Sequence, residues 1–121
     1  EYLPHKYNEN CVAYIGTHDN ATLVGGLDTA DKKEVDFARE YLRLKNLCNC
    51  DEKREVIKCL MATVADVSII TMQDILGLDN RARMNVPSRA NGNWQWRLML
   101  NWVFFDETAD WIKKITQTYG R

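Results

Sequence analysis

The sequence predicts an α/β fold in which two parallel strands are joined by helices. Two short apolar runs, "CVAYIG" at residues 11–16 and "DVSIITM" at residues 66–72, have the composition of buried strands. The segment between them has helical periodicity, as expected of the right-handed crossover that joins neighbouring parallel strands. Both runs end in polar residues. Because ligands bind at the carboxyl ends of parallel strands in α/β folds, we expect a site where the two runs end.

Composition limits the kind of protein and its partners. The 121 residues are 45% hydrophobic, which is sufficient for a compact unit, and we treat residues 1–121 as a single segment. The 16 Lys and Arg residues against 17 Asp and Glu residues give a net charge of -1, so neither nucleic acid nor a membrane surface is an expected partner. No apolar run is long enough to cross a membrane and no signal peptide is recognisable, so we expect a cytoplasmic location.

The first apolar run ends in Thr17, His18, Asp19 and Asn20. A carboxylate beside an imidazole at the end of a strand is chemically useful at the rim of a pocket. Asp and Asn are also ordinary turn residues after a strand, because their side chains bond to nearby backbone groups. These residues alone leave both interpretations open.

Two helices are predicted between the apolar runs. The first, at residues 31–45, has two adjoining apolar stripes, which are Val35, Ala38 and Leu42, and Phe37, Tyr41 and Leu44. Residues 46–51 interrupt the pattern. The second helix, at residues 52–65, follows the i, i+3, i+4, i+7 spacing closely, and its predicted inward residues are Ile57, Leu60, Met61 and Val64.

The second apolar run is followed by Gln73 and Asp74, so polar side chains end both predicted strands. Residues 77–93 then form a long loop rich in Gly, Asn and Arg, and loops of this length in a compact domain tend to be functional or disordered. Residues 105–121 close the chain as an amphipathic helix with Gly120 as its C-cap, and its predicted inward residues are Trp111, Ile112, Ile115 and Tyr119.

The four cysteines could ligate a metal, but their spacing argues against it. Structural zinc sites usually pair two ligands a few residues apart, twice over. Only Cys48 and Cys50 are close together, while Cys11 begins a predicted strand and Cys59 lies in a predicted helix. We therefore expect no metal, no disulfide and no cofactor.

Several short strings resemble one enzyme family. "YIGTHDNAT" at residues 14–22, "MQDILGL" at 72–78, "ARMNVP" at 82–87 and "GNWQWR" at 92–97 are similar, in this order and at these separations, to the C-terminal part of the 4-α-glucanotransferases, or amylomaltases. "YLPHKY" at residues 2–7 resembles the segment that precedes the family's THDN strand. The resemblance extends over almost the whole chain.

The resemblance implies a (β/α)8 barrel, of which this chain would form the last two strand–helix units. Such enzymes transfer segments of α-1,4-glucan between glucan chains with retention of configuration, through a covalent intermediate that needs an Asp nucleophile and a Glu acid/base. In the family both residues precede the THDN strand, so we expect neither in this chain. The first residue is not Met, which agrees with an upstream part.

By the same resemblance, Asp19 is the third catalytic carboxylate and His18 lies beside it. Both are expected to hydrogen-bond hydroxyl groups of the sugar ring as the ring distorts toward the transition state. The expected substrate-binding residues, which would shape the groove for α-1,4-glucans, are Asn20, Gln73, Asp74, Asn85 and Pro87.

Aromatic residues and departures from the family pattern bear on substrate choice. Trp94 and Trp96 flank one residue, so in an extended chain they would face the same side, toward either a sugar or the core. Ala21 and Arg81 stand where the family often has acidic residues, Gly26 where it has a Trp, and Ser88 where it has a Gly. The preferred glucan length does not follow from such a sequence.

A second interpretation is that the chain is a non-catalytic glucan-binding module or an inactive fragment, because the nucleophile and the acid/base are expected elsewhere. An upstream reading frame that continues into the rest of a barrel would distinguish the two. We also expect the isolated chain to self-associate or to have a loosened fold, because a slice of a barrel exposes sheet edges and apolar strand faces.

Overall fold

The computed structural model describes residues 3–44, 49–99 and 106–121 of the chain. Its sheet consists of β1 (Val12–Tyr14) and β2 (Val67–Ile69), which pair in parallel with Val12 opposite Val67 and Tyr14 opposite Ile69. The predicted parallel pairing is confirmed. Both strands are shorter than the apolar runs that predicted them, because the chain bends away from the sheet soon after Tyr14 and Ile69.

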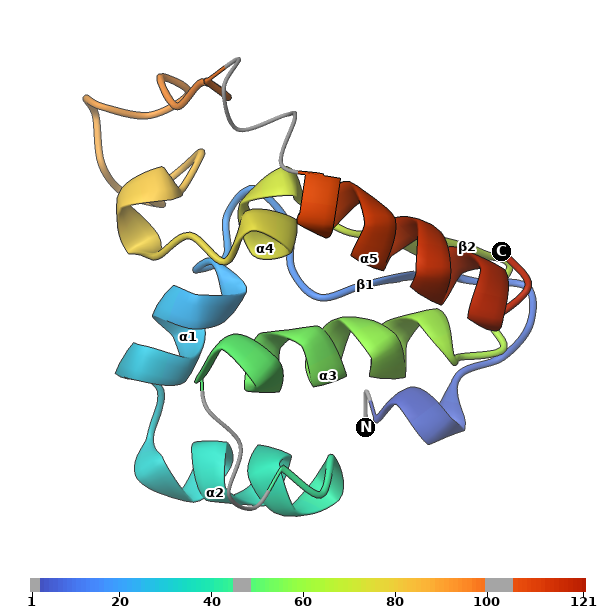
Figure 1. Ribbon diagram of the computed structural model, residues 1–121. Coiled ribbons are helices and arrows are strands. Elements are labelled where there is room, and N and C mark those ends of the chain that lie inside the picture. Colours follow the sequence, from blue (N-terminus) through green and yellow to red (C-terminus); the bar gives the residue numbers. More distant parts are fainter. Residues whose placement is uncertain (1–2, 45–48, 100–105) are drawn as a thin grey trace.

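The other described elements are helices, and they lie alongside the short sheet (Figure 1). The longest, α3 and α5, pack against each other beside the strands. No helix among the described residues is long and apolar enough to cross a membrane. The helical elements, in chain order, are η1 (Pro4–Lys6), α1 (Leu23–Thr29), α2 (Lys32–Tyr41), α3 (Asn49–Met61), α4 (Met72–Leu76), η2 (Asn80–Ala82) and α5 (Asp106–Thr118).

The core lies between α3, the strands and α5. Ile57, Leu60 and Met61 of α3 are buried, as the helical spacing predicted. Leu60 packs with Ala13 of β1, and Ile57 packs with Ile115 of α5. The prediction that Val64 points inward is wrong, because α3 ends at Met61 and the Val64 side chain is 57% exposed beyond it.

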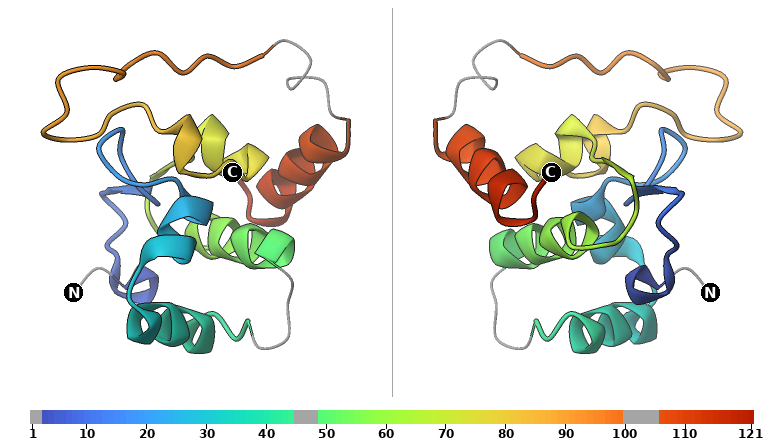
Figure 2. Two further views of the ribbon diagram at one scale, coloured as in Figure 1. Left: turned by 90° about the vertical axis from the view of Figure 1, so that its left-hand side faces the viewer. Right: turned by 90° about the vertical axis from the view of Figure 1, so that its right-hand side faces the viewer.

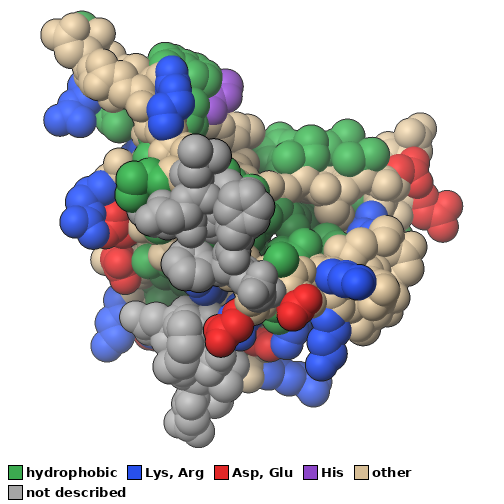
Figure 3. Space-filling view, turned by 45° about the horizontal axis from the view of Figure 1, so that its top comes forward, with side chains coloured by type: hydrophobic (Ala, Val, Ile, Leu, Met, Phe, Trp, Pro, Cys, Tyr) green, Lys and Arg blue, Asp and Glu red, His purple; other side chains and the backbone are tan. Residues whose placement is uncertain are grey.

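The other face of the sheet is not covered by the described residues. Alternate side chains of a strand point to opposite faces, so Ala13 contacts the helices while its neighbours in β1 point away from them. The side chains on the uncovered face are about half exposed, and they are Val12, Tyr14, Val67 and Ile69. The prediction that both runs form buried strands is therefore wrong on this face. Figure 3 shows hydrophobic side chains at the surface of the molecule.

A helix begins where the second strand was predicted to end. Thr71 is the N-cap of α4, and its hydroxyl accepts a hydrogen bond from the backbone N–H of Asp74 at 3.2 Å. Gly77, with a φ of 67°, ends this helix in the left-handed conformation. Gln73 and Asp74 consequently lie in the first turn of α4 and not at the tip of β2, which corrects the predicted strand boundary.

The last helix follows its sequence pattern except at its end. Ile115 is buried, Trp111 and Ile112 pack against the core, and Gly120 has the left-handed φ of 68° expected of a C-cap. The prediction that Tyr119 points inward is wrong, because α5 ends at Thr118 and Tyr119 is exposed.

Candidate functional site

A tight turn follows β1. The backbone N–H of Asn20 donates to the carbonyl of Thr17 at 3.1 Å, which closes a four-residue turn. In return, the Asn20 side-chain oxygen accepts from the backbone N–H and the hydroxyl of Thr17 at 2.7 and 2.9 Å. The ordinary role of a turn residue therefore accounts for the Asn20 side chain.

The turn brings the imidazole of His18 and the carboxylate of Asp19 together. Nε2 of His18 lies 3.4 Å from Oδ1 of Asp19, and both side chains are about half exposed. Adjacent side chains of an extended strand point to opposite faces, so this approach depends on the turn. Unlike Asn20, the Asp19 carboxylate is not used to close its own turn among the described contacts.

A distant segment holds the turn from the other side. The side-chain amide of Asn85 donates to Oδ1 of Asp19 at 2.5 Å, and the backbone N–H of Asn85 donates to the carbonyl of His18 at 3.2 Å. Arg83 Nη2 donates to the carbonyl of Asp19 at 2.9 Å. The structure thus brings Asp19 and Asn85, both of which the resemblance assigns to the site, into direct contact.

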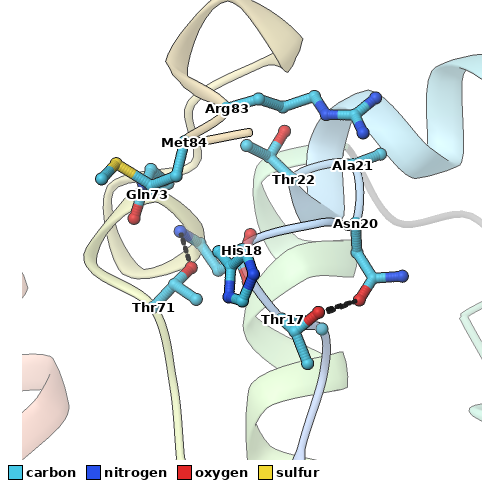
Figure 4. A pocket seen from close by; sticks show the side chains of 11 residues that line it. Thr17, His18, Asn20, Ala21, Thr22, Thr71, Gln73, Arg83 and Met84 are labelled. Carbon is cyan, nitrogen blue, oxygen red and sulfur yellow. Dashed lines mark hydrogen bonds between the residues drawn. The ribbon is translucent and has the colours of Figure 1, made fainter. Parts of the chain in front are cut away.

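A cavity of about 120 Å³ opens beside this turn. Figure 4 shows His18 between Thr71 and Gln73 on one side and Thr17 and Asn20 on the other. The lining comes from the turn after β1, the first turn of α4 and the segment before Asn85. The cavity therefore collects polar side chains that are far apart in the sequence.

Gln73 and Asp74 line the cavity, but both side chains are buried and bonded within the fold. The amide of Gln73 donates to the carbonyl of Ala82 at 3.3 Å. The carboxylate of Asp74 accepts from the backbone N–H of Leu23 at 2.6 Å, at the N-terminus of α1. Carboxylates stabilise helix N-termini by this contact. Asp74 thus joins α4 to α1 below the cavity.

Trp94 and Trp96 do not face the same side. The Trp94 ring lies against the His18 ring, with centroids 4.9 Å apart and planes inclined by 42°. Trp96 lines a separate open groove with Val24 and Asp28 of α1. The expectation assumed an extended backbone, whereas the φ of Trp94 is 63°. Pro87, earlier in the same loop, is exposed.

The segment η2 rests on α1 and leads to Asn85. The amide of Asn80 donates to the carbonyl of Gly25 at 3.2 Å, and a Cβ atom on Gly25 would lie only 2.2 Å from the Asn80 side chain. Arg81 binds the exposed carboxylate of Asp79, and this hydrogen bonding lowers the pKa of Asp79 below its ordinary value. Arg81 and Asp79 thus form a local ion pair.

Sequence reasoning missed two parts of the site. Thr71 lines the cavity, and its spacing to Asp74 is that of a capping box, which could have placed the start of α4. Arg83 and Met84 also line the cavity and lie within the string that includes Asn85. The hydrogen bond of Arg83 to the turn after β1 joins residues far apart in sequence, and no local pattern encodes it.

The cysteines and the other metal-binding side chains do not cluster where the structure describes them. Among the described residues, no group of three or more His, Cys, Asp or Glu side chains could hold a metal ion. Cys11 and Cys59 are free thiols, and burial raises the pKa of Cys59. Cys48 and the side chain of Cys50 lie outside the described residues, so the absence of metal stays a prediction.

The geometry defines a class of protein before any comparison. Two adjacent parallel strands are connected through helices, and a cavity with several polar residues in its lining lies where the chain leaves them. This is the arrangement of ligand sites in α/β proteins. The carboxylate, imidazole and amide side chains beside the cavity suit the binding of hydroxyl groups.

Comparison with known proteins identifies the family. A family model described as 4-alpha-glucanotransferase matches residues 1–101, and the chain therefore belongs to the 4-alpha-glucanotransferase family. The sequence is 46% identical over 123 residues to a 4-alpha-glucanotransferase of Clostridium butyricum, with 99% of this chain and 24% of the relative aligned. A chloroplastic/amyloplastic 4-alpha-glucanotransferase of Solanum tuberosum is 39% identical over 122 residues, with 99% of this chain and 21% of the relative aligned.

A solved structure has the same fold over nearly all of this chain. It is an amylomaltase from Streptococcus agalactiae in complex with acarbose, with a TM-score of 0.87 and 37% sequence identity. The match covers 98% of this chain and 23% of the amylomaltase chain. The chain thus spans about a quarter of the length of the relatives it matches.

Proposed function

We propose that this chain is part of a 4-alpha-glucanotransferase that transfers α-1,4-glucan segments between glucan chains with retention of configuration. The observation that carries the proposal is the convergence of His18, Asp19 and Asn85 at the end of β1. Family membership supports the reaction class. The bond to Asn85 and the neighbouring imidazole leave the Asp19 carboxylate half exposed and able to accept from a ligand.

In this proposal Asp19 acts by binding the transition state more strongly than the substrate. A sugar ring that distorts toward an oxocarbenium-like geometry moves its hydroxyl groups, and a carboxylate fixed in advance can accept from them in the distorted form. Nε2 of His18 and the amide of Asn85 both approach Oδ1 of Asp19, so they hold the orientation of the carboxylate. The fixed carboxylate then stabilises one ring geometry over the relaxed chair.

We further propose that residues 1–121 form the last two strand–helix units of a (β/α)8 barrel. The uncovered face of β1 and β2 supports a place in a barrel, because the inner face of a barrel strand is covered by the other strands, and the order of the matching strings supports the place within it. On the family pattern, the Asp nucleophile and the Glu acid/base would come from the part of the enzyme outside this chain.

The glucan groove in this proposal runs along the cavity and the loop after η2. The solved relative is in complex with acarbose, and a glucan ligand suits the hydroxyl-binding side chains around the cavity. The proposed groove residues are Asn20, Gln73, Asp74, Asn85 and Pro87. No cofactor is required for this reaction.

The test is an assay of the complete protein with maltotriose. We expect glucose and longer maltooligosaccharides to form together, since transfer from one chain lengthens another. The 121-residue chain alone is the matched control and should form neither, because the covalent route needs the missing nucleophile. Transfer by the isolated chain would contradict the proposal that the nucleophile and the acid/base lie outside this chain. A complete protein that binds glucan but does not transfer it would favour the binding-module interpretation.

A further inference from the structure

The backbone of Trp94 has a conformation that a tryptophan rarely adopts. Its φ of 63° lies in the left-handed region, which costs a residue with a Cβ atom free energy that glycine avoids. Two hydrogen bonds maintain it: the N–H of Trp94 donates to the carbonyl of Met84 at 2.6 Å, and Arg97 donates to the Trp94 carbonyl at 2.8 Å. Conformations of this kind persist where the surroundings determine them, and they are frequent at functional sites.

The Trp94 side chain gains little from burial. It is 52% exposed, whereas a tryptophan that anchors a core is largely covered. The packing that the structure records for the indole is the contact with the imidazole of His18, at 4.9 Å between centroids. The unusual backbone therefore places an aromatic ring against His18 and not against the core.

The loop that presents Trp94 is closed on itself. The side-chain oxygen of Asn93 accepts from the N–H of Val86 at 2.9 Å, and the side-chain amide of Asn93 donates to the carbonyl of Arg89 at 2.8 Å. Asn85, at the start of this loop, binds Asp19, while Trp94, at its end, contacts His18. One closed loop thus contacts both members of the pair.

We propose that Trp94 is a positioning residue for His18, whose indole restricts the imidazole to the orientation that faces Oδ1 of Asp19. This inference rests on the proposed function, in which His18 holds the orientation of the Asp19 carboxylate. A half-exposed imidazole has several rotamers available, and a ring packed against one face of it reduces their number. Aromatic pairs at this separation attract each other beyond simple burial.

A direct role for Trp94 as a stacking platform for sugar is the competing explanation. The two roles differ in how Trp94 depends on His18. A positioning residue has nothing to act on once the imidazole is gone, whereas a platform that contacts sugar directly keeps its effect. A double-mutant cycle of Trp94 and His18 therefore separates them.

The experiment measures kcat and KM for maltotriose disproportionation by the complete protein. We expect Trp94→Ala to lower kcat about fivefold to tenfold, with a much smaller change in KM, as for a lost aromatic pair. Trp94→Phe, which keeps an aromatic ring beside His18, should retain most of the activity. In the His18→Ala background, Trp94→Ala should cause no further loss. Trp96→Ala is the matched control, and its effect should be the same with or without His18.

An equal loss from Trp94→Ala in both backgrounds would overturn the inference. A separate measurement, the rate of carbethoxylation of His18 followed by mass spectrometry with His5 as internal reference, does not depend on activity. Trp94→Ala should raise the His18 rate severalfold and leave the His5 rate unchanged. If the complete protein transfers no glucan, the proposed function fails, and the carbethoxylation rate alone then decides whether Trp94 restrains His18; an unchanged rate overturns that restraint.

Discussion

Asp19 is the residue on which the proposed chemistry depends, and Asp19→Asn tests its charge with little change of shape. We expect the substitution in the complete protein to lower kcat by about 10² or more, because a transition-state hydrogen bond to a carboxylate is lost. Acarbose binding, measured by calorimetry, should be largely retained. Asp31→Asn is a matched control, because Asp31 caps α2 by accepting from Lys33 and lies outside the site. An unchanged kcat would show that Asp19 is an ordinary turn residue and has no catalytic role.

Ser88 has a backbone conformation that favours glycine. Its φ is 67°, in the region that glycine adopts without strain. We expect Ser88→Gly to stabilise the protein by up to about 1 kcal/mol, since the relief of strain is partly offset by greater freedom of the unfolded chain. Urea unfolding checks this, and a loss of stability would contradict it.

Gly92 provides the reverse substitution in the same loop. Its φ is 83°, and no atom lies within 4 Å of the position where a Cβ would be built. Gly92→Ala therefore adds backbone strain without a clash and should destabilise the loop by about 1 kcal/mol. If Ser88→Gly and Gly92→Ala change the free energy of unfolding in the same direction, backbone conformation does not explain the effect of either.

The contact between α1 and η2 depends on one glycine of a consecutive pair. We expect Gly25→Ala to separate η2 from α1, because its Cβ would overlap the Asn80 side chain at 2.2 Å. Since η2 leads to Asn85, transfer activity should fall together with stability. Gly26→Ala, whose Cβ would meet only Ala21 at 3.9 Å, should instead stabilise α1 by about 0.5–1 kcal/mol. Thermal unfolding and the transfer assay distinguish the two; equal effects would contradict this account.

Local sequence rules predicted the elements better than their ends. The parallel strands and the buried residues of α3 follow from periodicity, which reports the face that a core covers. The start of α4 was missed because the apolar run continues to Met72, although Thr71 caps a helix there. Helix α1 was not predicted, since it contains two adjacent glycines and is joined at its N-terminus to Asp74.

The candidate site was predictable only in part, because some of its contacts join segments that are far apart in the sequence. A site at the polar end of the first apolar run was expected from the strand pattern, and the family resemblance assigned Asn85 to the same site. The contact between His18 and Trp94 could not be predicted, because it needs a left-handed Trp94 and a loop closed by Asn93. Such contacts arise from tertiary structure, and neither hydrophobic period nor residue spacing encodes them.

At the scale of the molecule, the described helices cover one face of the sheet and no described residue covers the other. The helices cover the side of Ala13, and Figure 2 shows these helices and the loop that follows η2 from two opposite directions. On the other face, Val12 and Val67 stand opposite each other in the parallel pairing, and both are about half exposed. Exposed apolar strands with unpaired edges promote association between chains.

The isolated chain is therefore expected to self-associate, and Val12→Thr with Val67→Thr should reduce this. Threonine retains the shape and the strand preference of valine but adds a hydroxyl group, which lowers the apolar area that a second copy can cover. In the complete protein, where we propose that other strands cover this face, the same pair should destabilise by about 1–3 kcal/mol per unsatisfied hydroxyl group. Light scattering on the isolated chain and urea unfolding of the complete protein measure the two effects. A monomeric isolated chain with a sharp thermal transition would contradict the first expectation, and an unaltered complete protein would show that no other strand covers this face.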